Sequence, residues 1–143
     1  MRAVRLLRLA LVSALLGLAA YRIAAGPLRQ EWMSVVAWIG LPWLAVGWPL
    51  TLAGCRLIRR LGRGGGRLPG WLFPLAGVVA APAPAMAVAA VWGGAHTARE
   101  LVGFLFFPEG RCFLTAFAVS GAVTGIAWWT QARGDRVPAA QRS

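Results

Sequence analysis

The polar side chains that could carry chemistry are concentrated between residues 93 and 111. His96 and Glu100 stand four residues apart, so on a helix they would share a face, and Glu109 follows nearby. A histidine beside a carboxylate can act as general acid and base, or contribute two ligands to a metal ion. Because the sequence holds a single histidine, we expect no metal site and no cofactor. An ordinary charged loop is the alternative that we favour.

A second polar group consists only of arginines. All fifteen basic residues are arginine, which removes every mechanism that depends on a lysine, such as a Schiff base. Five of these arginines fall within twelve residues next to a glycine run, and they are Arg56, Arg59, Arg60, Arg63 and Arg67. Because they follow an apolar segment directly, we expect them to contact anionic lipid headgroups rather than nucleic acid, despite the net charge of +11.

Composition indicates where these groups are held. The chain has 143 residues, of which 59% are hydrophobic and 13% charged, and the mean hydropathy is +0.65. A soluble domain of this length could not cover its surface with so few polar residues. We therefore expect an integral membrane protein.

Four apolar runs, at about 6–25, 34–52, 71–92 and 112–130, are long enough to cross a hydrocarbon core of about 30 Å as helices. The prediction is an all-α membrane protein with four transmembrane helices, arranged as two hairpins. A basic, glycine-rich loop at 56–70 would join the hairpins, and a polar tail would occupy 131–143. The first run also fits a cleaved signal peptide, which remains an alternative.

One apolar stretch does not fit this pattern, because residues 101–107 are too few to cross the core. Charged residues border it on both sides. We expect a short interfacial or re-entrant helix before the last span.

The distribution of arginines predicts the orientation. With the N-terminus in the cytoplasm, eleven of the fifteen arginines lie on the cytoplasmic side, as the positive-inside rule requires. Both termini are then cytoplasmic. Arginine in place of lysine is typical of GC-rich codon usage, and we expect a bacterial cytoplasmic membrane. Cys55 and Cys112 would lie at opposite faces of that membrane, too far apart for a disulfide bond.

Small residues indicate how the helices pack. Gly121 and Gly125 form a GxxxG pattern in the last span, where a neighbouring backbone can approach closely. We expect the partner to be the third span, through Ala81, Ala85 and Ala89, with homodimerisation as the alternative. In the second span, glycines 40, 47 and 54 recur every seven residues and predict another packing seam.

Prolines interrupt the apolar runs. Pro42 and Pro49 in the second span and Pro82 and Pro84 in the third each remove a backbone donor and free a carbonyl group. In a transporter, the carbonyls freed in the third span could bind an ion at mid-membrane depth, but a plain kink is the interpretation that we favour because no charged residue accompanies them.

Three classes of function are compatible with these patterns. A non-catalytic accessory or assembly subunit is the leading prediction, because no span contains a charged residue in its interior. Its partner would be another membrane protein or a second copy of the chain. A small oligomeric channel or transporter built around the interrupted third span is the alternative. A membrane enzyme that uses His96 and Glu100 is the third.

Overall fold

The computed structural model describes residues 2–25, 32–63 and 68–134, and every regular element within these ranges is a helix. The elements are α1 (Arg2–Ala25), α2 (Trp32–Pro42), the π-helical segment η1 (Trp43–Gly47), α3 (Trp48–Arg63), α4 (Leu72–Ala80), α5 (Pro82–Trp92), α6 (Ala98–Phe104) and α7 (Pro108–Gly134).

Among the described residues, four stretches of helix are long and apolar enough to cross a membrane, which confirms the helical fold class and the number of candidate spans. They are Val4–Ala25, Val35–Gly62, Leu72–Trp92 and Pro108–Gln131. The second and third stretches each combine more than one helical element, since α2, η1 and α3 follow one another without a loop and α4 passes into α5 through a single residue.

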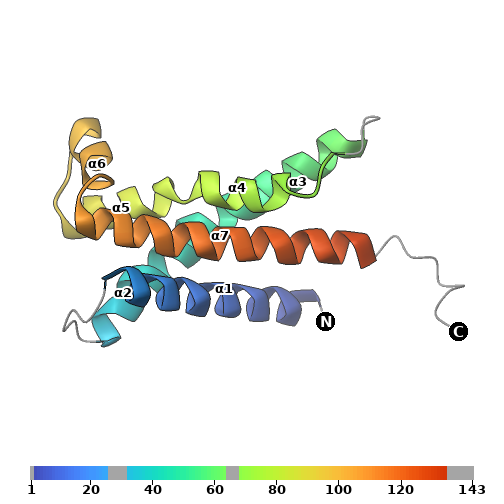
Figure 1. Ribbon diagram of the computed structural model, residues 1–143, viewed down its shortest axis with the longest axis horizontal. Coiled ribbons are helices and arrows are strands. Elements are labelled where there is room, and N and C mark those ends of the chain that lie inside the picture. The colour runs from blue at the N-terminus through green and yellow to red at the C-terminus, as the bar shows by residue number, and fades with distance from the viewer. Residues whose placement is uncertain (1, 26–31, 64–67, 135–143) are drawn as a thin grey trace, which may run out of the picture.

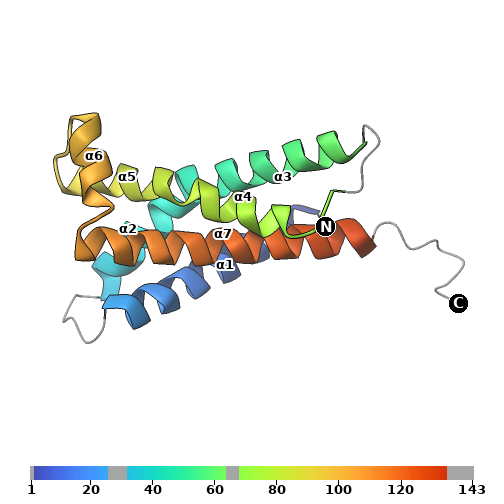
Figure 2. The same ribbon diagram turned by 45° about the horizontal axis from the view of Figure 1, so that its top comes forward.

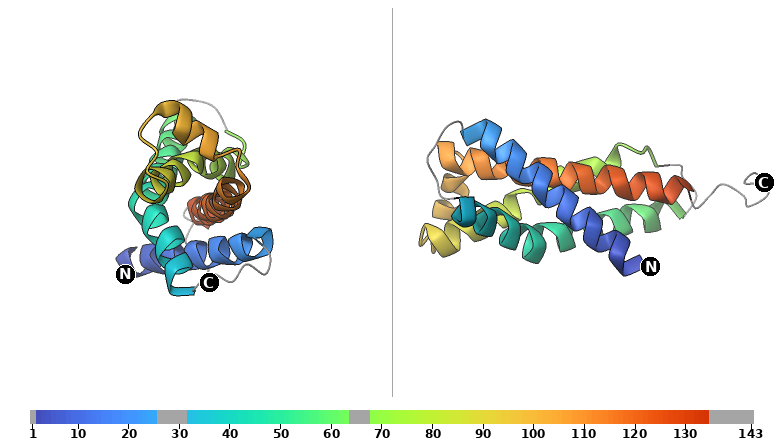
Figure 3. Two further views of the ribbon diagram at one scale, coloured as in Figure 1. Left: turned by 90° about the vertical axis from the view of Figure 1, so that its left-hand side faces the viewer. Right: turned by 90° about the horizontal axis from the view of Figure 1, so that it is seen from below.

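Helix α7 lies at the centre of the arrangement. It packs along α1 on one side and along α4 on the other (Figure 1). Helix α1 crosses α7 obliquely, as the right-hand view of Figure 3 shows. The start of α1, the end of α3 and the end of α7 lie at one end of the molecule, and α6 lies at the other end, across the direction of the long helices (Figure 2).

The second span is longer than the sequence predicts. The sequence predicts a loop at 56–70, and this prediction is wrong for residues 56–63. Helix α3 continues through Arg56, Arg59 and Arg60 to Arg63. Hydrophobicity falls after Cys55, but leucine and arginine are good helix formers, so the helix continues after the apolar run has ended. Arg67 lies outside the described residues, and of Arg63 only the backbone is described.

A π-helical turn changes the phase of this span. Pro42 cannot donate a backbone hydrogen bond, and the five residues that follow it are π-helical, with the N–H of Trp48 donating to the carbonyl of Trp43. The glycine seam predicted from a seven-residue repeat is therefore only partly right. Gly47 is buried and an added Cβ at Gly54 would contact Ala76 at 3.2 Å, but a Cβ at Gly40 would meet nothing within 4 Å.

The third span is interrupted where prolines predict it. Helix α4 ends at Ala80 and α5 begins at Pro82, with Ala81 between them. The N–H of Ala81 donates to the carbonyl of Val78 over 3.1 Å, so the break is a short kink that reuses a carbonyl freed by Pro82. Pro82 stands at the start of a helix, where the missing N–H costs least.

The last span begins earlier and ends later than expected. Helix α7 starts at Pro108 instead of residue 112 and continues to Gly134, so the first residues of the predicted polar tail are helical. Residues 135–143 of that tail lie outside the described ranges. The short helix that precedes α7 is α6, which covers Ala98–Phe104 and lies close to the predicted stretch at 101–107.

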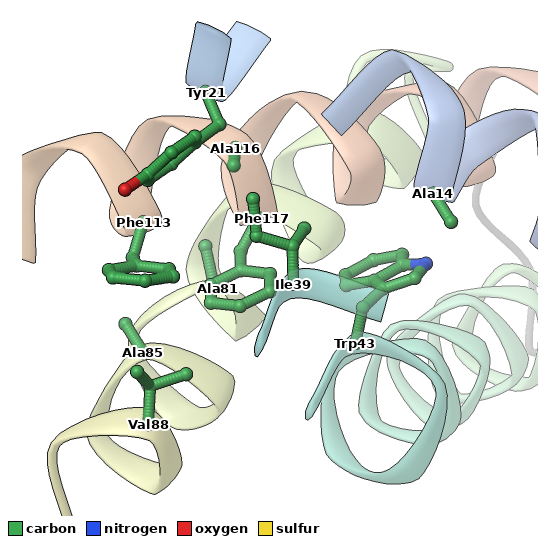
Figure 4. Close-up of a cluster of buried hydrophobic side chains, with 10 residues drawn as sticks. All are labelled: Ala14, Tyr21, Ile39, Trp43, Ala81, Ala85, Val88, Phe113, Ala116 and Phe117. Atoms are coloured by element: carbon green, nitrogen blue, oxygen red, sulfur yellow. The ribbon is translucent and has the colours of Figure 1, made fainter. Parts of the chain in front are cut away.

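The core lies towards the end of the molecule that carries α6. Phe113 and Phe117 of α7 face Ala81, Ala85 and Val88 of the third span, and Ile39 and Trp43 approach from the second span (Figure 4). Stacking continues through these rings, since the Phe113 and Phe117 ring centroids are 6.3 Å apart and those of Trp43 and Phe117 are 6.5 Å apart. Aromatic rings thus fill the space that the small alanines leave.

Candidate functional site

The predicted polar site surrounds the start of α6, where Glu100 closes a capping box. The Thr97 side-chain oxygen accepts a hydrogen bond from the N–H of Glu100 over 3.2 Å. In return, Oε2 of Glu100 accepts bonds from the backbone N–H groups of His96 over 3.0 Å and of Thr97 over 3.1 Å. These bonds satisfy amides that a helix N-terminus leaves without partners.

This geometry contradicts the shared helical face expected for His96 and Glu100. His96 precedes α6, and its backbone N–H, not its imidazole ring, donates to the Glu100 carboxylate. Hydrogen bonds from the backbone of His96, then from the backbone and side chain of Thr97, lower the pKa of Glu100. The carboxyl group therefore stays ionised at neutral pH, which suits a helix cap and makes it a poor proton donor.

The third candidate, Glu109, does not join this group. It is exposed in the first turn of α7, where a negative charge interacts favourably with the helix dipole. A close turn separates it from α6, because Gly110 lies against the carbonyl group of Phe104, where a side chain would not fit. Among the described residues, no three His, Cys, Asp or Glu side chains come together in a way that could hold a metal ion.

A buried polar network occupies the middle of the molecule. The Trp43 indole Nε1 donates to the Ser13 hydroxyl over 3.2 Å, and that hydroxyl donates to the carbonyl of Ala10 over 2.9 Å. From α7, the Ser120 hydroxyl donates to the Ser13 carbonyl over 2.8 Å. Trp43, Ser13 and Ser120 are fully buried, so these bonds tie η1, α1 and α7 together away from solvent.

Close contacts hold α7 on both sides. Gly17 of α1 lies against the Ser120 hydroxyl, and a Cβ there would be 3.0 Å from the Ala116 carbonyl oxygen. On the other side, Gly121 lies against the backbone of Gly77, and Gly125 lies against the backbone of Phe73 and Pro74. Both contacts are made within one chain.

The predicted partner of the GxxxG pattern is thus right in its helix and wrong in its register. The third span packs on Gly121 and Gly125, but through Gly77 and the backbone near Phe73, one or more turns before the predicted alanines. Ala81, Ala85 and Ala89 are buried, and the first two pack in the aromatic core instead. The kink at Ala81 separates these alanines from the stretch of α4 that runs beside α7.

The interruptions of the second and third spans lie beside each other. A Cβ at Gly47, the last residue of the π-helical segment, would be 3.1 Å from Cγ of Pro84. The Trp43 ring covers Gly47 from within its own helix. The prolines thus place two irregular stretches of backbone together in the core.

The arginine-rich end of the molecule is built from several helices. Exposed arginines there come from α1, α3 and α7, and they are Arg5, Arg8, Arg56, Arg60 and Arg133. Arg59 is half-buried. Arg133 stacks on the Trp129 ring, with its guanidinium carbon 4.0 Å from the ring centroid.

Comparison of the chain with protein-family models, with curated proteins and with solved structures finds no match in any of the three. The site must therefore be interpreted from its own geometry.

Both cysteines are free thiols in the structure, with Cys55 buried and Cys112 half-buried.

Several residues that organise this structure were not singled out from the sequence. Ser13 and Gly17 belong to a run of small residues with Ala10 and Ala14 at helical spacing, a signal that they pack against another helix. The stretch from Thr97 to Glu100 has the T-x-x-E pattern of a capping box, which predicts the role that Glu100 has. Neither signal depends on knowledge of the fold.

Proposed function

We propose that the protein is a non-catalytic accessory or assembly subunit of a bacterial cytoplasmic membrane. The observation that carries this proposal is the kind of polar group in the interior. Among the described residues no charged side chain is buried, and beside the aromatic rings of Trp and Tyr the buried polar side chains are the hydroxyls of Ser13, Thr51, Ser120 and Thr124. Each of them bonds to a backbone carbonyl, as helix packing requires.

The proposed topology has two hairpins with both termini in the cytoplasm. The basic end faces the cytoplasm, in agreement with the positive-inside rule. Helix α6 then lies in the outer interface, where its neighbouring exposed side chains Phe106 and Phe107 enter the lipid. The tie between Ser13 of α1 and α7 supports retention of the first helix, because cleavage would remove one side of the contact.

Introduced cysteines test this topology better than the native ones, because Cys55 is buried and Cys112 half-buried. In a background without native cysteines, Ala98→Cys reports on the α6 end and Gln131→Cys on the basic end, and both positions are exposed. A membrane-impermeant thiol reagent added outside intact cells should modify Ala98→Cys only. Modification of Gln131→Cys alone would reverse the orientation.

Extraction in a mild detergent tests the proposed role. A subunit should copurify with a membrane-protein partner, or with itself, at a fixed ratio that is the same for N-terminal and C-terminal tags. Val91 is 75% exposed, so Val91→Trp changes the surface of α5 without disturbing the core, and it should reduce recovery of a partner that binds to this surface of α5. Val88 is fully buried, and substitutions there would change the core instead. A purely monomeric protein under all mild conditions would contradict the proposal.

A small channel or transporter is the second candidate, favoured by the contact between the two helix interruptions at Gly47 and Pro84. Irregular backbone inside membrane proteins is often found where substrates or ions bind. Flux assays in proteoliposomes separate the two candidates. Flux that is lost in Gly47→Val, but kept in Gly40→Val, would replace the subunit proposal by transport.

A further inference from the structure

The two ends of the molecule differ in how their charges are balanced. The carboxylates among the described residues, Glu100 and Glu109, lie on α6 and at the start of α7. At the opposite end, the described arginine side chains form no hydrogen bond or ion pair with any described residue, and Arg133 stacks on Trp129; these side chains are Arg5, Arg8, Arg56, Arg59, Arg60 and Arg133. Counter-charge for the basic end therefore has to come from outside the described part of the chain.

The last two turns of α3 present this charge on one face. Arg56, Arg59 and Arg60 are spaced by three and four residues, so they lie on one side of the helix. The opposite side packs against α4 and the residues just before it, since a Cβ at Gly54 would contact Ala76 at 3.2 Å and one at Gly62 would contact Leu68 at 3.5 Å. This packing holds the basic face in one direction.

Helix length places this face at the depth of lipid headgroups. From Trp32 to Arg63 the helix is about 48 Å long, whereas the hydrocarbon core is about 30 Å thick. The excess falls at the end of α3, after the apolar residues. Leu57 and Leu61 are exposed among these arginines in the sequence of α3, and Trp71 is exposed just before α4, a mixture that suits the boundary between headgroups and acyl chains.

We propose that the basic face of α3, formed by Arg56, Arg59 and Arg60, binds the phosphate groups of anionic phospholipids. Guanidinium groups bind phosphate oxygens in pairs of parallel hydrogen bonds, and three of them on one rigid face can hold one or two headgroups. An acidic protein surface is the competing partner, but it would leave Leu57, Leu61 and Trp71 facing water. The inference rests on the proposed insertion in a membrane and adds a preference for one class of lipid.

Lipid-dependent thermal stability of the purified full-length protein tests this inference. In dodecyl maltoside, added phosphatidylglycerol should raise the melting temperature by several degrees, and phosphatidylcholine should not. Arg56→Gln with Arg60→Gln should remove most of this shift, while Arg56→Lys with Arg60→Lys should keep part of it. The shift should also shrink in about 1 M salt, where charges are screened beyond roughly 3 Å.

Two variants with the same loss of charge serve as controls. Arg99→Gln with Arg111→Gln, exposed at the α6 end, should keep the full response, and Arg5→Gln with Arg8→Gln should weaken it less than the α3 pair does. Equal weakening by all three pairs, or no response of the wild type, would overturn the inference. So would an acidic protein that binds the α3 face while the lipid response is absent. Because the assay uses purified protein, it can fail while topology labelling still supports membrane insertion.

Discussion

Helix α7 meets its two main neighbours in different ways. Towards α4 the contact is backbone against backbone, with Gly121 on Gly77 and Gly125 on the backbone of Phe73. Towards α1 the closest contact is made by a side chain, because the Ser120 hydroxyl lies between Gly17 and the Ser13 carbonyl, and the backbone carbonyl of Ala116 lies farther from Gly17. In lipid, apolar burial gives little drive for helix association, so close packing and hydrogen bonds must supply it.

The difference predicts which face tolerates change. A backbone cannot move aside without shifting a whole helix, whereas a hydroxyl can rotate or be removed. We therefore expect the α4 face to respond to added volume with large losses of stability, and the α1 face to respond with smaller losses that depend on the partner side chain. Reversible unfolding in mixed micelles of dodecyl maltoside and SDS measures both.

The largest effect is expected for Gly121→Ile combined with Gly125→Ile. Each new side chain would overlap the backbone of α4, and overpacking of this kind costs about 1–3 kcal/mol per site. Gly40→Ile is the matched control, because a Cβ at Gly40 meets nothing within 4 Å and the variant should unfold close to the wild type. If the double variant were as stable as the control, α4 would not contact α7 through its backbone.

The same contrast explains what the sequence could predict. Apolar length alone identifies the four helices able to cross a membrane, because that requirement depends on composition and not on partners. The GxxxG spacing also identifies Gly121 and Gly125 as a packing face, because small residues let a neighbouring backbone approach. The register of their partner depends on where the third span bends, and the kink at Ala81 moves Ala81 and Ala85 into the aromatic core and leaves Gly77 beside α7.

The second span shows a related limit. A seven-residue glycine repeat predicts one seam only while the helix keeps about 3.6 residues per turn. The π-helical turn from Trp43 to Gly47 breaks that phase, so Gly40 no longer lies in the seam. At the polar site, the spacing of His96 and Glu100 allows a shared helical face beside the favoured interpretation of an ordinary charged loop, and the position of Thr97 makes Glu100 a helix cap instead.

On the α1 face, Gly17→Ala should lower the free energy of unfolding by about 1 kcal/mol, because the new methyl group would meet the Ser120 hydroxyl and the Ala116 carbonyl. Adding Ser120→Ala should restore part of this loss, with a coupling of roughly 0.5 kcal/mol or more. No such rescue exists for Gly121→Ala, since its neighbour Gly77 has no side chain to shorten. Strict additivity of Gly17→Ala and Ser120→Ala would mean that the hydroxyl does not separate the helices.

Ser13→Ala tests the hydrogen bonds of the same face. The variant leaves the buried Trp43 indole N–H without its acceptor, and an unsatisfied buried donor costs about 1–3 kcal/mol. We expect the low end of this range, because the indole N–H groups of Trp48 and Trp128 are already buried without a partner in the described structure. Unchanged stability would indicate that the indole finds another acceptor, such as a nearby carbonyl.

The smallest loss is expected for Ser120→Ala alone. The hydroxyl donates to the Ser13 carbonyl, but that carbonyl lies inside α1 and still accepts the bond of its own helix, so no buried group loses its last partner. Hydrogen bonds between membrane helices are worth about 0.6 kcal/mol on average, and we expect a loss of that size. Thr130→Ala is the control, because its exposed hydroxyl bonds only to Ala127 of its own helix and its loss should be smaller still. Ser120→Ala could instead lower the free energy of unfolding as much as Gly121→Ile with Gly125→Ile does. One hydrogen bond would then hold α1 as firmly as backbone contact holds α4, which would contradict the difference between the two faces.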